Sequence, residues 1–319
     1  MKRVKFKKLL SELKTLTYKQ KQELLDKIKV AEAKDIILGD DAKSNCCKHC
    51  SSKHYVKWGK ESGLQRYKCK SCNKTYNQLT NSPLAKLHKK EEWLTNANEM
   101  IKGTSLATTA EACGIAVSTA FRWRHKFLEI LSNSKPDSLG GIIEADETYF
   151  LQSNKGQRNI ESPRKRGGKA KKRGLSSEQV PVLIARDRNK NTISCKLDAV
   201  NSSTISEALV DVVKKGSVLC TDGHPVYPSV ALDCGALHKP LNIKAGVKVV
   251  EKIYHIQNVN AYDSRLKSWI KRFHGVSTKY LQKYLGWWRI TDSWKQLTPM
   301  HFLHELLGIK SSHQRILLI

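Results

Sequence analysis

The sequence predicts a multidomain chain in which a helical N-terminus, a small cysteine-rich module and a helical pair precede a larger mixed α/β domain. Three observations support this class. Two closely spaced cysteine pairs stand in the first quarter of the chain, and helical periodicity dominates the residues up to 131. After a polar, proline-containing segment at 132–138, short apolar runs typical of strands replace that periodicity. The length of 319 residues is sufficient for two or more domains.

The charge of the chain restricts its partners. Lys and Arg number 57 against 29 Asp and Glu, a formal net charge of +28. Basic side chains that neutralise phosphates release counterions, so nucleic acid is the first partner to consider; the alternative is a lysine-rich surface without a partner. A hydrophobic share of 39% is too high for a disordered chain. No apolar run is long enough for a membrane span, and the lysine-rich start does not resemble a signal peptide, so we expect a cytoplasmic protein without a membrane partner.

The N-terminal segment, residues 1–44, is predicted to be helical. Over residues 1–36 several leucines recur at intervals of three or four, with Lys and Glu between them. Such an amphipathic helix serves either internal packing or oligomerisation, and the sequence does not distinguish the two.

A zinc ribbon is predicted for residues 45–80. Cys47 and Cys50 form one CxxC pair, Cys69 and Cys72 form a second, and 18 residues separate them. The two-residue gap lets both sulfurs of a pair reach one tetrahedral ion, and two pairs complete a four-thiolate set for zinc. Because all four positions are filled by protein, that zinc would be structural. Cys46 is a less suitable substitute for Cys47, since its gap to Cys50 is three residues.

Residues 84–131 carry a helix–turn–helix pattern. A first helix is expected around 106–112, a turn at Cys113–Ile115, and a second helix from Ser118, whose hydroxyl can cap it. Ala110 lets the helices approach closely, Gly114 permits a left-handed turn, and Cys113 is expected to be a buried thiol. An ordinary helical hairpin with a basic face is the alternative. In the DNA-binding interpretation the second helix presents three basic residues to DNA: Arg122, Arg124 and Lys126.

The larger domain is assigned to residues 140–300, followed by a C-terminal tail at 301–319. Strands are expected at 141–150, 180–187, 191–197 and 217–222, with a helix at 202–214 before the last of them. Two further helices are expected, one over about 255–273 and one from Ser277 to Arg289, whose aromatic residues we assign to the core. This order of elements predicts a mixed α/β sheet.

A strongly basic loop lies between the first two of these strands. Seven of the ten residues at 164–173 are basic, so the loop has nothing to bury and is expected to clamp a DNA backbone; a solvated charge run is the alternative. The basic residues of this loop are Arg164, Lys165, Arg166, Lys169, Lys171, Lys172 and Arg173.

Two aspartates occupy positions where a carboxylate is costly unless it is paired or binds metal. Asp146 lies inside an apolar strand and Asp222 ends another. If the strands are neighbours, both carboxylates can converge on Mg²⁺ or Mn²⁺, as in two-metal phosphodiester chemistry; the alternative is that both are turn or cap residues. Asn260 and Lys267 are two helical turns apart and share one helix face, so the amide oxygen is a candidate metal ligand and the lysine a candidate phosphate contact.

These motifs together resemble the bacterial insertion-sequence transposases of the DDE superfamily that place a zinc ribbon before an RNase H-like catalytic core. The resemblance covers nearly all of residues 45–290. It implies that Asp146 and Asp222 are the first two catalytic residues and that Asn260 replaces the usual glutamate, with Asp263 one turn on as the alternative third ligand. The motifs that carry it are the ribbon with Gln65–Cys69, Glu144–Tyr149, Thr221–Gly223, Asn260 with Lys267, and His274–Ser277.

The resemblance implies a transposase that binds the terminal inverted repeats of its own element. It would cleave DNA with a metal-activated water and use the freed 3′-hydroxyl for strand transfer, as a homo-oligomer assembled on double-stranded DNA at the nucleoid. Two alternatives remain: a zinc-ribbon DNA-binding regulator with an inactive core, which the asparagine at the third position favours, and an RNase H-like nuclease without strand transfer.

Overall fold

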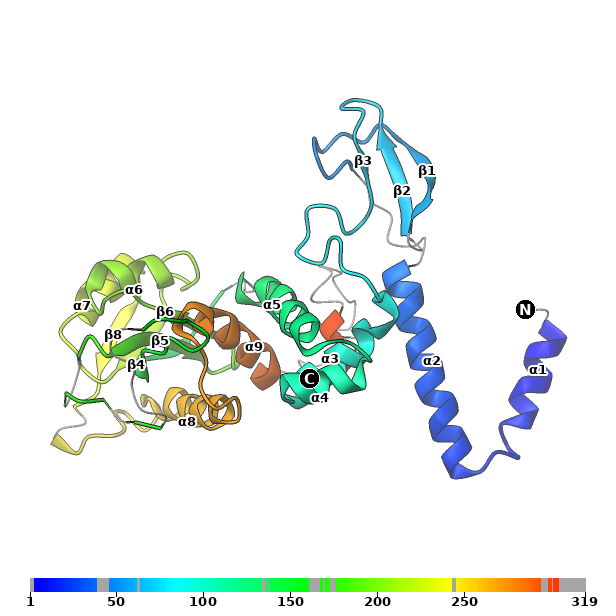
Figure 1. Cartoon of the computed structure of the whole chain (residues 1–319). Coiled ribbons are helices and arrows are strands. Elements are labelled where there is room, and N and C mark those ends of the chain that lie inside the picture. Colours follow the sequence, from blue (N-terminus) through cyan, green and yellow to red (C-terminus); the bar gives the residue numbers. More distant parts are fainter. Residues whose placement is uncertain are drawn as a thin grey trace. The chain divides into compact units, whose positions relative to one another are not determined.

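The computed structural model describes residues 3–38, 46–61, 64–133, 136, 138–160, 167–168, 170–172, 176–242, 245–293, 298–299 and 301–303. The chain divides into two compact units, Met1–Phe127 with Leu297–Ile319, and Leu128–Gln296. None of the described helices is long and apolar enough to cross a bilayer. The elements as far as the end of the helical pair are α1 (Arg3–Glu12), α2 (Tyr18–Leu38), β1 (Tyr55–Glu61), β2 (Leu64–Cys69), β3 (Thr75–Tyr76), the 3₁₀ helix η1 (Lys90–Glu92), α3 (Trp93–Lys102), α4 (Leu106–Ala112) and α5 (Val117–Asn133) (Figure 1).

The N-terminal segment is helical, as predicted, but it forms two helices. Thr17 precedes α2 and forms a capping box with Gln20: the Thr17 N–H donates to Gln20 Oε1 at 2.9 Å, and the Gln20 N–H donates to Thr17 Oγ1 at 3.4 Å. A strong cap of this kind starts a new helix, which explains why the leucine periodicity does not continue through this point.

The cysteine-rich module is a three-stranded antiparallel sheet in the order β1-β2-β3. Its core is aromatic: Tyr67 packs edge-on against Tyr55, with ring centroids 5.3 Å apart, and stacks on Tyr76 at 5.6 Å. The buried sulfurs of Cys47 and Cys69 belong to the same cluster.

The helical pair has the predicted order with one shift. Ser105 caps α4 by accepting the Thr108 N–H at 3.1 Å, and Gly114 in the turn has φ +58°. The second helix, α5, begins at Val117, so Ser118 lies in its first turn and does not precede it as predicted. Trp93 of α3 is fully buried against Phe127 of α5.

The second unit is built on a mixed five-stranded sheet, which is consistent with an RNase H-like core. The strand order is β6-β5-β4-β7-β8; β4, β5 and β6 pair antiparallel, whereas β4, β7 and β8 pair parallel. The elements are β4 (Ile142–Leu151), β5 (Gln179–Asp187), β6 (Thr192–Lys196), α6 (Ser202–Leu209), β7 (Val218–Thr221), α7 (Tyr227–Asp233), β8 (Leu237–Pro240), α8 (Gln257–Lys271), the 3₁₀ helix η3 (Thr278–Tyr280) and α9 (Leu281–Ser293).

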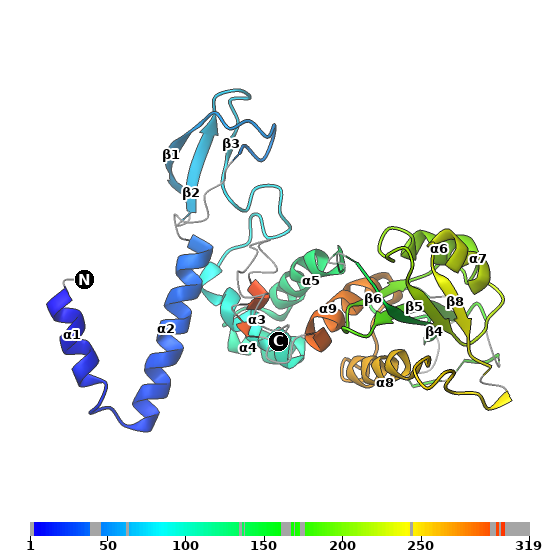
Figure 2. The same cartoon turned by 180° about the vertical axis from the view of Figure 1, so that it is seen from behind.

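Helices cover both faces of this sheet. In both views α6 and α7 lie on one face and α8 on the other (Figures 1 and 2). The α6/α7 face is the apolar core, in which Ile143 and Ala145 of β4 pack with Leu209 and Tyr227. The opposite face carries buried polar residues: Arg289 of α9 donates to the Ser194 carbonyl of β6 at 2.5 Å.

Two details of this unit differ from the sequence prediction. α7 and β8 were not predicted, because four to seven residues are too few for a clear periodic pattern. α6 ends at Leu209 and not at 214, because Val213 forms a parallel bridge with Leu139. The boundary between the two units falls inside α5, whose last residues contact α9: a Cβ at Gly286 would lie 2.8 Å from the Ser132 Cα.

Candidate active site and nucleic-acid interface

The sheet register places Asp146 and Asp222 at the same level of two neighbouring strands. β4 and β7 are parallel, with Glu144 opposite Cys220, and each aspartate lies two residues further along. Asp222 directly follows Thr221, the last residue of β7, and is exposed, whereas Asp146 is half-buried. The two strands are therefore neighbours, which is the condition that the sequence argument required for the carboxylates to converge.

The electrostatics of Asp146 indicate a crowded group of carboxylates. Burial, followed by the charges of Asp222, Glu147 and Asp263, raises the pKa of Asp146 to about 7. The neighbouring backbone N–H of Glu147 donates to Asp146 Oδ1 at 2.8 Å and opposes this shift only in part. Carboxylates from β4, the end of β7 and α8 thus act on one another across this part of the sheet.

Glu147 is a member of this group that the sequence reasoning did not assign. Burial raises its pKa, and the charge of Asp222 adds to the effect. The Tyr227 hydroxyl of α7 donates to Glu147 Oε1, and the pKa of Tyr227 is raised well above its usual value by burial and by Glu147. Glu147 stands next to Asp146 in the strand, and this adjacency was the signal available in the sequence.

Helix α8 carries the remaining candidates on one face. Asn260 is exposed, Asp263 is half-buried, and Lys267 donates to Asp263 Oδ2 at 2.8 Å. Asp263 Oδ1 is buried and has no hydrogen-bond partner among the residues that the structure describes. Asp263 is the α8 residue whose charge contributes to the raised pKa of Asp146. Within the described ranges these carboxylates do not form a group of three with ligand atoms all within 4.8 Å.

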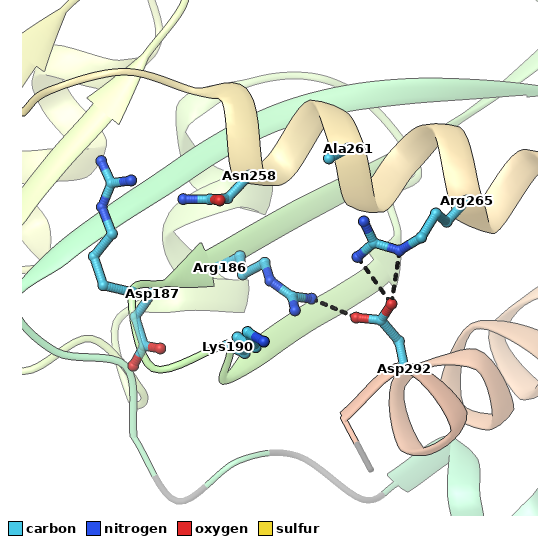
Figure 3. Close-up of a pocket in the computed structure, with 8 residues that line it drawn as sticks. Arg186, Asp187, Lys190, Asn258, Ala261, Arg265 and Asp292 are labelled. Carbon is cyan, nitrogen blue, oxygen red and sulfur yellow. Dashed lines mark hydrogen bonds and ion pairs between the residues drawn. The ribbon is translucent and has the colours of Figure 1, made fainter. Parts of the chain in front are cut away.

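A pocket of about 330 Å³ lies on the other flank of α8 (Figure 3). Asp292 of α9 accepts from Arg186 of β5 at 2.8 Å and from Arg265 of α8 at 2.9 Å. These ion pairs connect α8 and α9 to the sheet, so we assign this pocket a structural role. Its lining residues are Arg186, Asp187, Arg188, Lys190, Asn258, Ala261, Arg265 and Asp292.

The four predicted zinc ligands lie together. The ligand atoms of Cys47, Cys50, Cys69 and Cys72 are all within 4.8 Å of one another, and this set can hold a metal ion. Cys47 Sγ is 3.7 Å from Cys72 Sγ, and Cys50 Sγ is 3.6 Å from Cys69 Sγ. Thiolates bound tetrahedrally at about 2.3 Å from zinc would stand about 3.8 Å apart, which matches these distances. Cys47, and not Cys46, belongs to the set.

The basic residues of α5 do not share one role. Arg122 and Lys126 are exposed. Arg124, predicted to face DNA, is only 2% exposed, and its guanidinium donates to the Thr104 carbonyl at 2.9 Å and to Thr109 Oγ1 at 3.1 Å. The prediction is wrong for this side chain, because α5 turns Arg124 toward α4, where it holds the helical pair together. Cys113 is buried as predicted, and burial raises its pKa to about 11.

Five of the seven basic residues of the loop at 164–173 lie outside the described residues. Lys171 and Lys172 are described and exposed, and the Lys171 backbone N–H donates to Glu178 Oε2 at 2.6 Å. The other five predicted DNA contacts of this loop fall on residues that the structure does not describe: Arg164, Lys165, Arg166, Lys169 and Arg173.

Comparisons with known proteins address the identity of the second unit. Residues 138–288 match the ISXO2-like transposase domain. An uncharacterized protein in the transposable element ISH50 of Halobacterium salinarum is 26% identical over 247 residues, which cover 75% of this chain and 82% of that protein.

Two solved structures show weak similarity. A simian T-cell lymphotropic virus intasome in complex with PP2A regulatory subunit B56 gamma matches 60% of this chain and 67% of its own chain, at 11% identity and a TM-score of 0.29. A pre-cleavage Mos1 transpososome matches 68% of this chain and 78% of its own chain, at 10% identity and a TM-score of 0.24. Similarity at these TM-scores carries no conclusion. The domain match and the relative in a transposable element agree with the motifs of the sequence, and residues 138–288 form an ISXO2-like transposase domain.

Proposed function

We propose that the chain is the transposase of an insertion sequence, which binds the terminal inverted repeats of its element and catalyses metal-dependent DNA cleavage and strand transfer. The ISXO2-like domain at 138–288 and the relative from a transposable element support this function. Its site of action would be the cytoplasm, at the nucleoid, as a homo-oligomer assembled on double-stranded DNA.

The observation that carries the proposal is the parallel register of β4 and β7, which brings Asp146 and Asp222 to one level. Their environment suits a divalent cation, since burial, and after it repulsion among neighbouring carboxylates, raises the pKa of Asp146 to about 7. Oxygen ligands are those that Mg²⁺ and Mn²⁺ prefer. The unpartnered buried oxygen of Asp263 adds a further acceptor on the same side of the sheet.

Within this site each residue has a distinct role. Asp146 and Asp222 would hold the cations, with Asn260 or Asp263 as the third ligand. Bound Mg²⁺ or Mn²⁺ supplies activation of the attacking oxygen and stabilises the leaving oxygen of the phosphodiester. Lys267 would orient the scissile phosphate; its ammonium is held by Asp263 at 2.8 Å, so it is presented on the same helix face as Asn260.

DNA recognition is assigned to the first unit and to the basic loop of the second. In this proposal α4 and α5 act as a helix–turn–helix, with Arg122 and Lys126 as contacts, and the basic residues at 164–173 hold a DNA backbone. Arg124 is removed from the set of contacts because it is buried. The four cysteines would hold one structural zinc that organises the ribbon.

A cleavage assay tests the proposal. Purified chain is incubated with duplex DNA that carries the terminal repeat of its native locus, with Mg²⁺, with Mn²⁺, or with EDTA. We expect strand cleavage at the repeat end only with a divalent cation. Specific repeat binding without any cleavage would favour the DNA-binding regulator, and cleavage without joining of the 3′ end to target DNA would favour the nuclease.

A further inference from the structure

Glu144 is a fully buried carboxylate in β4, two residues before Asp146. Because side chains alternate along a strand, both carboxylates emerge on the same face of the sheet, the face that α8 covers. A buried charge persists only where hydrogen bonds and an opposite charge compensate it. The groups that contact Glu144 therefore indicate the role of this buried carboxylate.

Three of the groups that donate hydrogen bonds to Glu144 belong to two residues in the first turn of α8, Asn258 and Val259. Glu144 Oε2 accepts the backbone N–H of Asn258 at 2.7 Å and that of Val259 at 3.0 Å, and Oε1 accepts Asn258 Nδ2 at 2.7 Å. The residue at the helix's own N-cap position, Ile256, makes no side-chain cap hydrogen bond. Since the first N–H groups of a helix have no partner within it, Glu144 caps α8 from a strand 114 residues earlier in the chain.

The charge of Glu144 is balanced by Arg188, which directly follows β5, and the carboxylate also contacts the segment that leads into α8. Arg188 lies 2.9 Å from Glu144 Oε1, and it also donates to the Ile253 carbonyl at 2.8 Å. His255 Nδ1 is 3.3 Å from the same carboxylate oxygen. The approach to α8 and its first turn are thus fixed to one carboxylate of β4.

The other end of α8 is held from the segment just after β4. Lys155 Nζ donates to the carbonyls of Phe273, His274 and Gly275 at 3.0, 3.3 and 2.8 Å, directly after the helix ends. A carboxylate at the N-terminus and an ammonium at the C-terminus both complement the helix dipole. Glu144 of β4 and Lys155 after β4 therefore fix the position of α8 along its own axis.

We propose that Glu144 is a positioning residue of the catalytic set: by capping α8 from β4 it fixes where Asn260 and Asp263 stand relative to Asp146. This inference rests on the proposed function. Asn260 is two residues beyond Asn258, so any shift or rotation of the first turn of α8 moves the third ligand directly. Groups that orient metal ligands typically affect metal affinity by about 10–100-fold when they are changed.

The test compares Mn²⁺ binding and DNA cleavage in the full-length, zinc-loaded chain, with Mn²⁺ binding followed by electron paramagnetic resonance of the free ion. The variant Glu144→Gln keeps the size of the side chain but removes its charge and one of its acceptors. Asn258→Ala removes only the 2.7 Å side-chain bond and leaves no charge unpaired, so it serves if Glu144→Gln does not fold. Asp187→Asn is the matched control, because Asp187 is also a buried carboxylate but its oxygens bond to Asn191 and Gly140 and not to a residue of α8.

We expect Glu144→Gln to weaken Mn²⁺ binding by about tenfold or more, and Asn258→Ala to weaken it several-fold, with cleavage reduced in parallel. Asp187→Asn should lower the melting temperature and leave Mn²⁺ affinity as in the wild type. The positioning role alone would be overturned by one combination of results. Asp146→Ala would bind no Mn²⁺, while Asn258→Ala, and Glu144→Gln if it folds, would keep the wild-type Mn²⁺ affinity. Wild-type Mn²⁺ binding by Asp146→Ala would instead remove the metal site of the proposed function, and the inference with it.

Discussion

Asp263 Oδ2 and Lys267 Nζ lie 2.8 Å apart, one turn from each other on α8. The pair occupies the face of the helix that also carries Asn260, and the charge of Asp263 acts on Asp146. Under the proposed function, Asn260 and Asp263 are therefore both candidates for the third ligand. The contact between Asp263 and Lys267 would also set the position of the ammonium group that meets DNA.

Substitution of these residues separates their roles. Asn260→Ala should greatly reduce cleavage if its amide oxygen completes the cation's ligands, whereas Asp263→Ala should have a milder effect, through loss of the contact that orients Lys267. Lys267→Ala should slow cleavage without stopping it, because a lysine positions phosphate and holds no metal. The measurement is the single-turnover cleavage rate on repeat-end DNA. If Asn260→Ala cleaves fully and Asp263→Ala is inactive, the third ligand is Asp263, one turn further along α8.

The two aspartates of the sheet give a stricter prediction. Asp146→Ala and Asp222→Ala should each abolish cleavage. Removal of either carboxylate would deprive the cation of one of its ligands, and the attacking water would then not be activated. Binding to terminal-repeat DNA, measured by gel shift, should be unchanged. Asp211→Ala is a suitable control, since Asp211 is exposed and follows α6. Residual cleavage by both active-site variants would be incompatible with the assigned pair.

Two arginines of α5 should give opposite phenotypes. Arg124→Ala removes buried hydrogen bonds to the Thr104 carbonyl and Thr109 Oγ1, and should lower the free energy of unfolding by about 2 kcal/mol. Arg122→Ala changes an exposed side chain, so stability should be retained while DNA affinity falls and the slope of log affinity against log salt decreases by about 1. Thermal unfolding and DNA titrations at several salt concentrations measure both. An Arg122→Ala variant with wild-type affinity and slope would exclude Arg122 from the interface.

The sequence was sufficient to predict features that depend on local spacing. The CxxC spacing identified Cys47, Cys50, Cys69 and Cys72, and the apolar runs placed the strands that carry Asp146 and Asp222. The structure groups these cysteine sulfurs and makes these strands parallel neighbours. The grouping of the cysteines and the positions of the strands follow from local patterns, whereas the pairing of the two strands was only a condition of the sequence argument and is supplied by the structure.

Features that depend on long-range contacts could not be predicted in this way. The helix–turn–helix pattern suggested that Arg124 faces DNA, but the direction of each side chain on α5 depends on where α4 packs. Likewise, Glu144 was noted only as part of a motif, since its role as a cap depends on Asn258, 114 residues away. Tyr227 and Glu147 meet across two elements, one of which was too short to predict.

The cysteine set predicts the metal content of the protein. Freshly purified, reduced chain should contain about one zinc per molecule, held by four thiolates. Cys69→Ser should lose this zinc and unfold the ribbon, because Cys69 is fully buried within the tyrosine cluster. Elemental analysis and near-ultraviolet circular dichroism measure the two effects. Cys46→Ser should retain the full zinc content, and absence of zinc in the wild-type chain would refute the assignment.

The last prediction concerns Asp292, whose carboxylate accepts from Arg186 and Arg265 in the pocket beside α8 (Figure 3). The Arg186 side chain is only 5% exposed and that of Asp292 only 8%, whereas that of Arg265 is 47% exposed. Asp292→Asn therefore leaves a buried guanidinium without its counter-charge, and should lower the free energy of unfolding by about 3–5 kcal/mol.

Arg265→Gln provides the comparison, because loss of an exposed partner should cost about 0–1 kcal/mol. Urea unfolding followed by tryptophan fluorescence reports both variants, since tryptophans of α8 and α9 are buried on this face of the sheet. The protein that remains folded should still cleave DNA, because Asp292 lies on the flank of α8 that faces away from Asp263 and Lys267. Equal and small losses in the two variants would show that Arg186 is hydrated in solution, and that the pair does not hold α9 to the sheet.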